Sequence, residues 1–154
     1  MPEYSIILAD DHQMLRKVIR EIIEASPDMK VVQEVNDGLE LLEVLKKITP
    51  HMIILDISMP NLRGIEATRE VKRINSDIKI LILSMHKKNE YVHHVFSAGA
   101  EGYLLKEDSD TELFTAIDTI RKGGKYLSPI LSKELAREAI EVRNGNVRFS
   151  GLSS

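Results

Sequence analysis

Three short runs of apolar residues limit the folds open to this chain. They read Ile-Ile-Leu-Ala at 6–9, Met-Ile-Ile-Leu at 52–55 and Ile-Leu-Ile-Leu at 80–83. Runs this short without a polar residue are typical of strands buried on both faces of a parallel sheet. Two other runs, at 31–35 and 101–105, include polar residues, and we predict them to be edge strands.

Helical patterns separate these runs. Residues at the spacing of one helix face follow the first run: Met14, Leu15, Val18, Ile19, Ile22 and Ile23. Further helices are predicted from about 38, 62, 88 and 109. Two of them begin with residue pairs at capping-box spacing, Asp37 with Glu40 and Ser109 with Glu112. Alternating strands and helices predict an α/β, doubly wound parallel sheet, and the flavodoxin-like five-stranded order 2-1-3-4-5 matches this pattern.

Polar residues follow four of the five predicted strands. They are Asp10 and Asp11, Asp56, Ser84, and Lys106. Taken singly, an Asp or Ser after a strand is more often a helix cap or a turn residue. Ligands of open parallel sheets, however, bind beyond the carboxyl ends of the strands, so we expect these side chains to lie together.

Three carboxylates at one edge of the sheet would repel one another, and a bound cation would relieve this repulsion. At a separation of ~5 Å and an effective dielectric of 20, each pair repels by ~3 kcal/mol, which a divalent ion relieves. Mg²⁺ prefers oxygen ligands, and phosphoryl transfer needs positive charge around the transferred group. The set therefore indicates Mg²⁺-dependent phosphoryl chemistry, with Asp56 attacking and Lys106 neutralising charge.

Composition excludes several other classes. The chain of 154 residues has no cysteine, which excludes disulfides, thiolate zinc sites and thiol nucleophiles. Its net charge of -3 gives no overall basic field for nucleic acid. No apolar run approaches the ~20 residues that cross a bilayer, so we expect a cytoplasmic protein without membrane contact.

Four segments resemble the receiver domain of two-component response regulators, over roughly residues 4–122. They are LADDH at 8–12, MIILDISMPNLRGIEA at 52–67, LILSM at 81–85 and AGAEGYLLK at 98–106. The resemblance implies that Asp56 takes a phosphoryl group from a phosphohistidine of a sensor histidine kinase. It also implies that Mg²⁺ is held by Asp10, Asp11, Asp56 and the backbone carbonyl of Ser58, and that Lys106 and Ser84 bind the phosphoryl oxygens.

The same resemblance implies a conformational switch. Phosphorylation adds negative charge and acceptor oxygens at Asp56, which draw Ser84 inward. Tyr103 then rotates from an exposed to a buried position, and the face formed by the fourth helix, fifth strand and fifth helix changes. The alternative is that Tyr103 is a simple edge-strand aromatic. Ser58 and His86 are expected to flank the water path and tune dephosphorylation, and a homodimer on phosphorylation is a further expectation.

The C-terminal part resembles a narrower subfamily. Residues 98–106 and 115–129 are similar to NarL/FixJ-like regulators, whose output is a LuxR-type helix-turn-helix that controls transcription. We expect a receiver at 1–124 and a linker helix and tail at 125–154, the helix opening with Ser128 and Pro129. The chain stops before any helix-turn-helix, so DNA binding is expected only through a domain not present here. A truncated regulator and a stand-alone receiver both fit.

Two alternatives and one departure from the family pattern stay open. Haloacid-dehalogenase-like phosphatases also use a strand-end Asp with Mg²⁺, but they need a second Asp where Ser58 stands. A pseudo-receiver that serves only as an interaction module would not need the acidic set. We therefore expect no enzyme beyond one that catalyses its own phosphorylation and dephosphorylation. Glu107 follows Lys106 where many receivers have proline after a cis bond, so the isomer of that bond is open.

Overall fold

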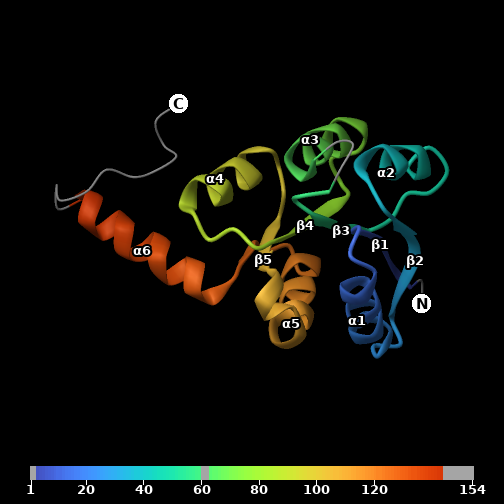
Figure 1. Ribbon diagram of the computed structural model, residues 1–154, viewed down its shortest axis with the longest axis horizontal. Helices are drawn as coiled ribbons and strands as arrows, with labels where there is room; N and C mark the ends of the chain where they lie inside the picture. The colour runs from blue at the N-terminus through green and yellow to red at the C-terminus, as the bar shows by residue number, and fades with distance from the viewer. Residues whose placement is uncertain (1–2, 60–62, 144–154) are drawn as a thin grey trace.

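The computed structural model describes residues 3–59 and 63–143, and forms one parallel sheet with helices on both faces (Figure 1). In chain order the elements are β1 Tyr4–Ala9, α1 Gln13–Glu24, β2 Met29–Val35, α2 Gly38–Val44, β3 Met52–Asp56, α3 Gly64–Ile74, β4 Lys79–Ser84, α4 Asn89–Ser97, β5 Gly102–Leu105, η1 Lys106–Asp108, α5 Ser109–Arg121, β6 Tyr126–Leu127 and α6 Pro129–Arg143. The strand order is β2-β1-β3-β4-β5-β6. This confirms the flavodoxin-like fold and the order of the five predicted strands.

The central strands divide the core into two layers, because successive side chains point to opposite faces of a sheet. On β1, Ile7 and Ala9 pack into the layer covered by α2, α3 and α4. Ile6 and Leu8 pack into the layer covered by α1 and α5. Figure 1 shows the two groups of helices on opposite sides of the sheet. The continuous apolar runs are explained by this double burial.

The far edge of the sheet differs from the prediction. β2 is an edge strand as expected, but β5 lies between β4 and a sixth strand. In β6, Tyr126 and Leu127 pair in parallel with Gly102 and Tyr103. The prediction of β5 as an edge was therefore wrong, because a two-residue strand gives no periodic signal in the sequence.

The helix starts were predicted with mixed success. The Asp37 carboxylate accepts a hydrogen bond from Glu40 N at 2.8 Å and caps α2 as expected. The pair Ser109 and Glu112 forms no capping box, since η1 runs directly into α5. Glu112 instead accepts a hydrogen bond from the Tyr126 hydroxyl at 2.6 Å. Leu62, where we expected the third helix to begin, lies outside the described residues.

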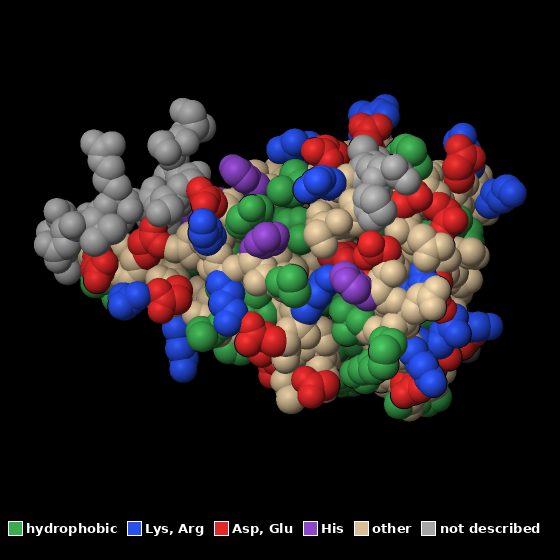
Figure 2. Space-filling view, viewed as in Figure 1, with side chains coloured by type: hydrophobic (Ala, Val, Ile, Leu, Met, Phe, Trp, Pro, Cys, Tyr) green, Lys and Arg blue, Asp and Glu red, His purple; other side chains and the backbone are tan. Residues whose placement is uncertain are grey.

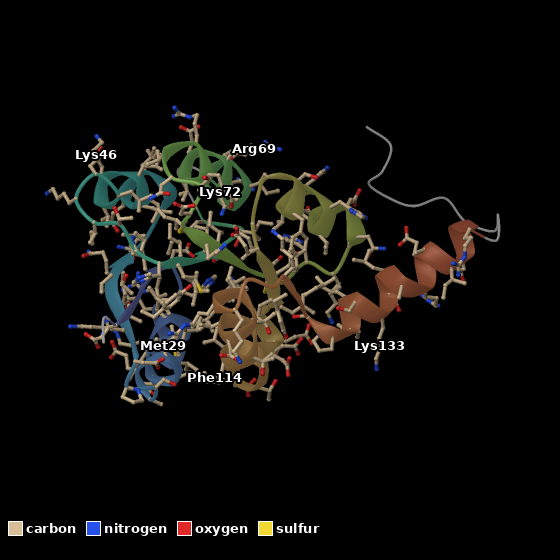
Figure 3. The ribbon with its side chains drawn as sticks, turned by 180° about the vertical axis from the view of Figure 1, so that it is seen from behind. Met29, Lys46, Arg69, Lys72, Phe114 and Lys133 are labelled. Carbon is tan, nitrogen blue, oxygen red and sulfur yellow. The ribbon has the colours of Figure 1, made fainter. Side chains whose placement is uncertain are left out.

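One buried ion pair ties α3 to the sheet at the end remote from the strand carboxyl ends. Lys72, labelled on α3 in Figure 3, lies with its Nζ 2.7 Å from Glu101 Oε2. The other Glu101 oxygen accepts a hydrogen bond from Ile80 N at 2.8 Å. Both side chains are largely buried, so each supplies the opposite charge that the other needs away from water.

The C-terminal helix begins on the sheet and then leaves it. Ser128 N donates to Tyr103 O, and Ser128 Oγ accepts from Leu105 N at 2.9 Å. Leu131 is buried in the core layer, whereas most of α6 runs away from the body (Figure 1). Acidic and basic side chains are interspersed on the face seen in Figure 2. Within residues 3–59 and 63–143, no helix has the length and apolar character that a bilayer crossing requires.

Candidate functional site

The carboxyl ends of four neighbouring strands deliver the predicted side chains to one edge of the sheet. Asp56 and Ser84 are the last residues of β3 and β4, and both are fully buried. Asp10 follows β1, and Lys106 follows β5 as the first residue of η1. The convergence predicted from the sequence is therefore present.

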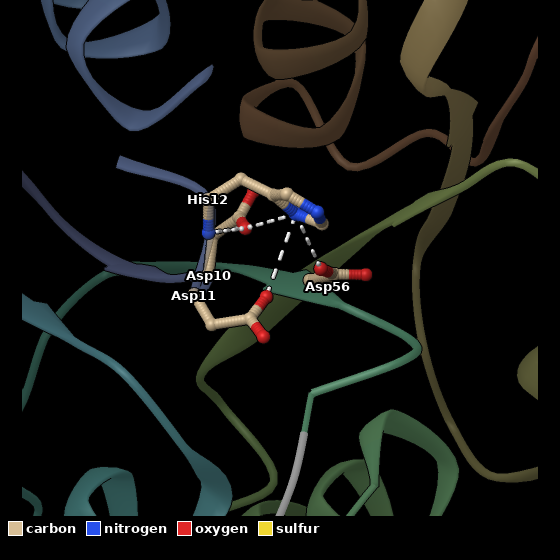
Figure 4. A group of neighbouring side chains, drawn as sticks. All are labelled: Asp10, Asp11, His12 and Asp56. Carbon is tan, nitrogen blue, oxygen red and sulfur yellow. Dashed lines mark hydrogen bonds and ion pairs between the residues drawn. The ribbon is translucent and has the colours of Figure 1, made fainter. Parts of the chain in front are cut away.

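Asp10, Asp11 and Asp56 form an acidic cluster, which Figure 4 shows facing the ring of His12. One carboxylate oxygen from each residue and one ring nitrogen of His12 all lie within 4.8 Å of one another. Asp10 and Asp56 are buried, whereas the Asp11 side chain is 42% exposed. The cluster is therefore open to solvent on the side of Asp11.

Both carboxylate oxygens of Asp56 accept hydrogen bonds. Oδ1 accepts hydrogen bonds from Ser58 N and Ser58 Oγ, each at 3.0 Å. Oδ2 lies 3.0 Å from Lys106 Nζ, whose side chain is 11% exposed. Burial alone would raise the pKa of Asp56, but the Ser58 hydrogen bonds and the Lys106 ammonium together lower it. Asp56 is thus an ionised, fixed carboxylate.

The pKa of Asp10 is shifted in the opposite direction from that of Asp56. Burial raises the pKa of Asp10; the hydrogen bond from His12 N opposes this and the Asp56 charge adds to it. Asp10 Oδ2 is buried and has no hydrogen-bond partner among the described residues. An unpartnered buried oxygen beside two more carboxylates is a donor set that fits a hard divalent cation such as Mg²⁺. No described contact involves the Ser58 carbonyl, so its predicted part in this set stays a prediction.

Ser84, the last residue of β4, is in contact with Tyr103 of β5. The Tyr103 hydroxyl is 2.9 Å from Ser84 Oγ and 2.7 Å from the carbonyl oxygen of His86, to which it donates. Ser84 Oγ also accepts a hydrogen bond from His86 N at 2.9 Å. Tyr103 is fully buried, so this structure has the inward position that we expected to follow phosphorylation.

Ser58 and His86 line one cavity of about 140 Å³, together with Ile57, the residue after Asp56. The His86 ring stacks on Tyr91 with ring centroids 4.2 Å apart. Arg63 lines the same cavity from the start of α3. The two residues expected to tune dephosphorylation therefore line the same cavity, which is large enough to hold water.

The loop after β5 contains the peptide bond whose isomer was open. The described residues contain no cis peptide bond, so the Lys106-Glu107 bond is trans. Glu107 pairs with Lys87 at 2.8 Å, which joins this loop to the segment between β4 and α4. Lys106 reaches Asp56 from this trans loop.

His12 was not among the residues predicted for the site. It is the N-cap residue of α1, yet its side chain makes no capping hydrogen bond and turns into the acidic cluster. Its position directly after Asp11 was the only signal in the sequence.

The comparisons with known proteins agree on one family. The family model for the response regulator receiver domain matches residues 6–118. Transcriptional regulatory protein DegU of Brevibacillus brevis is 38% identical over 133 residues, which are 86% of this chain and 56% of DegU. Response regulator UvrY of Escherichia coli K12 is 33% identical over 149 residues, which are 97% of this chain and 68% of UvrY.

A solved structure supports the same assignment. The crystal structure of a LuxR-family two-component response regulator from Aurantimonas sp. SI85-9A1 superposes with a TM-score of 0.85 at 35% identity, covering 90% of this chain and 99% of that one. The present chain spans little more than half the length of DegU. With the family model matching most of the chain and the strand-end residues converging as they do, the chain belongs to the response regulator receiver domain family.

Proposed function

We propose that this domain is a phosphorylation-activated switch in which Asp56 accepts a phosphoryl group from a phosphohistidine of a sensor histidine kinase. The observation that carries the proposal is the state of Asp56. It is a fully buried carboxylate with a lowered pKa, held by Lys106 and Ser58 beside two further carboxylates. These contacts keep the carboxylate ionised and fix its orientation, which a nucleophile requires.

The proposed step is a transfer between two nucleophiles. An Asp56 oxygen bonds to phosphorus, the phosphorus–nitrogen bond of the donor breaks, and its electron pair leaves with the imidazole of the donor, which takes up a proton. Lys106, 3.0 Å from Asp56 Oδ2, neutralises charge on the phosphoryl oxygens. Asp10, Asp11, Asp56 and the Ser58 carbonyl would hold Mg²⁺, which when bound supplies further positive charge.

Mass spectrometry after treatment with acetyl phosphate and Mg²⁺ tests this step. The wild type should gain the mass of one phosphoryl group, and Asp56→Asn should gain none. Asp77→Asn is the matched control, because Asp77 is an exposed carboxylate. Labelling of Asp56→Asn at the wild-type level would contradict the proposal. Steady release of phosphate over many turnovers would instead indicate a phosphatase.

Ser84 and Tyr103 are proposed to carry the switch to the α4-β5-α5 face. A phosphoryl oxygen on Asp56 gives Ser84 a charged acceptor, and Ser84 already contacts the Tyr103 hydroxyl. Phosphorylation would then favour the inward arrangement of the loop between β4 and α4. Nuclear magnetic resonance shifts in α4 and β5 on addition of a phosphoryl mimic should appear in the wild type and shrink in Ser84→Ala. Equal shifts in both proteins would contradict this route.

Ser58 and His86 are proposed to set the lifetime of the acyl phosphate, because both line one cavity and Ser58 also donates hydrogen bonds to Asp56. Hydrolysis needs a water to reach phosphorus, and side chains in that cavity decide how water is placed. The decay of the phosphorylated form should change in Ser58→Ala and in His86→Ala. Decay rates equal to that of the wild type in both variants would remove this role.

The output is proposed by analogy with the relatives. DegU is a transcriptional regulatory protein and exceeds this chain in length. We propose that residues 1–124 are the receiver, that 125–154 are linker and tail, and that transcription is controlled through a helix-turn-helix outside this chain. The exchange with the kinase would take place in the cytoplasm, and phosphorylation would favour a homodimer.

A further inference from the structure

His12 occupies the acidic cluster without a role in the proposed transfer. Its Nδ1 lies 3.2 Å from Asp10 Oδ1, 3.4 Å from Asp11 Oδ1 and 3.6 Å from Asp56 Oδ2. The extended backbone at His12, with φ -91° and ψ 99°, turns the ring toward the strand ends in place of capping α1. Figure 4 shows the ring facing all three carboxylates. One nitrogen is therefore within reach of an oxygen from every member of the cluster.

These separations match those between ligands of a single metal ion. With ligand bonds of about 2.0 to 2.2 Å, neighbouring ligand atoms lie about 3.0 Å apart in an octahedral shell and about 3.4 Å apart in a tetrahedral one. The three nitrogen-to-oxygen distances fall in and just above this range. The ring nitrogen is therefore close enough to each of the three carboxylate oxygens to bind the same ion.

A second feature points independently to a cation. The Asp10 side chain is 3% exposed, and its Oδ2 has no hydrogen-bond partner within the described part of the chain. A buried carboxylate oxygen without a donor carries a desolvation penalty that a cation removes. The side chains of Asp11 and His12 are 42% and 60% exposed, so an ion has a route into the cluster between them.

We propose that His12 is a nitrogen ligand of this pocket and makes it a site for borderline divalent cations such as Zn²⁺, as well as for Mg²⁺. Imidazole nitrogen binds Zn²⁺ well, whereas Mg²⁺ prefers oxygen and keeps its waters. The proposal shares Asp10, Asp11 and Asp56 with the proposed function and rests on it only for that Mg²⁺ set. Lys106 Nζ lies 3.4 Å from the same nitrogen, so its positive charge would lie next to a bound metal ion.

Calorimetric titration with Zn²⁺ and with Mg²⁺ tests the role of His12. His12→Ala should weaken Zn²⁺ binding at least about tenfold, since even indirect partners of metal ligands cost that much. Its Mg²⁺ affinity should stay within about twofold of the wild type, because Mg²⁺ gains little from a nitrogen ligand. His94→Ala, which removes an exposed histidine of α4, is the matched control and should leave both affinities unchanged.

A direct readout of ligation comes from nitrogen-15 spectra of the histidine rings. The His12 resonance should shift on addition of one equivalent of Zn²⁺, and His12→Asn should behave as His12→Ala does. Thermal unfolding of both variants without metal shows whether they are folded. Unchanged Zn²⁺ affinity in the folded variants overturns the inference. So does tighter Mg²⁺ binding without loss of Zn²⁺ binding, which would show that the ring only blocks the pocket.

The result is separable from the proposed function. Phosphorylation of Asp56 by acetyl phosphate with Mg²⁺, together with unchanged Zn²⁺ binding in His12→Ala, would overturn the role of His12 alone. Loss of Zn²⁺ binding in His12→Ala with no phosphorylation of the wild type would support His12 and contradict the proposed function.

Discussion

Asp10→Asn should stabilise the metal-free protein. Asn keeps the shape of the side chain but removes a buried charge whose Oδ2 has no partner among the described residues. One carboxylate oxygen of Asp10 and one of Asp56 lie within 4.8 Å of each other, and two charges at that limit repel by ~3.5 kcal/mol at an effective dielectric of 20. Lys106 lies in the same pocket and offsets part of this, so we expect a net gain of about 2 kcal/mol. For a domain of this size that raises the melting temperature by ~4 to 8 °C.

The gain should depend on pH in one direction. The pKa of Asp10 is raised in the fold, so the protonated carboxyl stabilises the wild type fully below the unfolded value of ~3.9. That contribution is lost as the pH rises through the folded pKa. Asp56 has a lowered pKa, and in both proteins its contribution to stability is lost as the pH falls. The difference between variant and wild type should therefore be small near pH 4 and full at pH 7.5.

Thermal unfolding without metal at the two pH values is the assay, and Asp11→Asn is the control. The Asp11 side chain is 42% exposed, so its substitution should change stability by less than ~0.5 kcal/mol. Saturating Mg²⁺ should narrow or reverse the advantage of Asp10→Asn, because the wild type binds the ion more tightly. An equal gain at both pH values, or no gain at pH 7.5, would refute the electrostatic reasoning.

Three other substitutions should lower stability for different reasons, each measured by urea unfolding. Glu101→Ala should cost about 3 kcal/mol, because it leaves the largely buried Lys72 ammonium without its carboxylate, and a cost below ~1 kcal/mol would contradict this. Tyr103→Phe should cost ~1 to 2 kcal/mol through the lost hydroxyl contacts, including that with Ser84, and should leave phosphorylation of the aspartate intact. Gly102→Ala should cost ~1 to 3 kcal/mol, because the new Cβ would lie 2.7 Å from two core methyl groups, and a neutral effect would show that both side chains move freely.

The sequence predicted the arrangement of the site because of a general property of parallel sheets. Asp56, Ser84 and Lys106 come from separate strands, yet each stands at a carboxyl end, and those ends share one edge. The strands themselves were predictable because burial on both faces leaves continuous apolar runs. Neither prediction needed the conformation of any loop.

The features that were missed depend on contacts between distant segments. Tyr126 and Leu127 are strand residues only because β5 offers them a free edge. Glu112 has the spacing of a cap, but the Tyr126 hydroxyl lies within 2.6 Å of it and uses its carboxylate. His12 has the sequence position of a helix start, and only the backbone angles at that residue show that its ring enters the acidic cluster. Local patterns contain none of this information.

β5 contacts both the phosphorylation pocket and the start of the C-terminal helix. It carries Tyr103, which contacts Ser84, and it ends one residue before Lys106. On its other side, Ser128 is bound twice, by its own N–H to Tyr103 O and by its Oγ to Leu105 N. Because Ser128 is fully buried, breaking either bond would leave a polar group without water. Any displacement of β5 therefore moves the start of α6 with it. Farther along α6, Glu138 accepts a hydrogen bond from Asn89 at the start of α4, so α6 also contacts the α4 side of the α4-β5-α5 face.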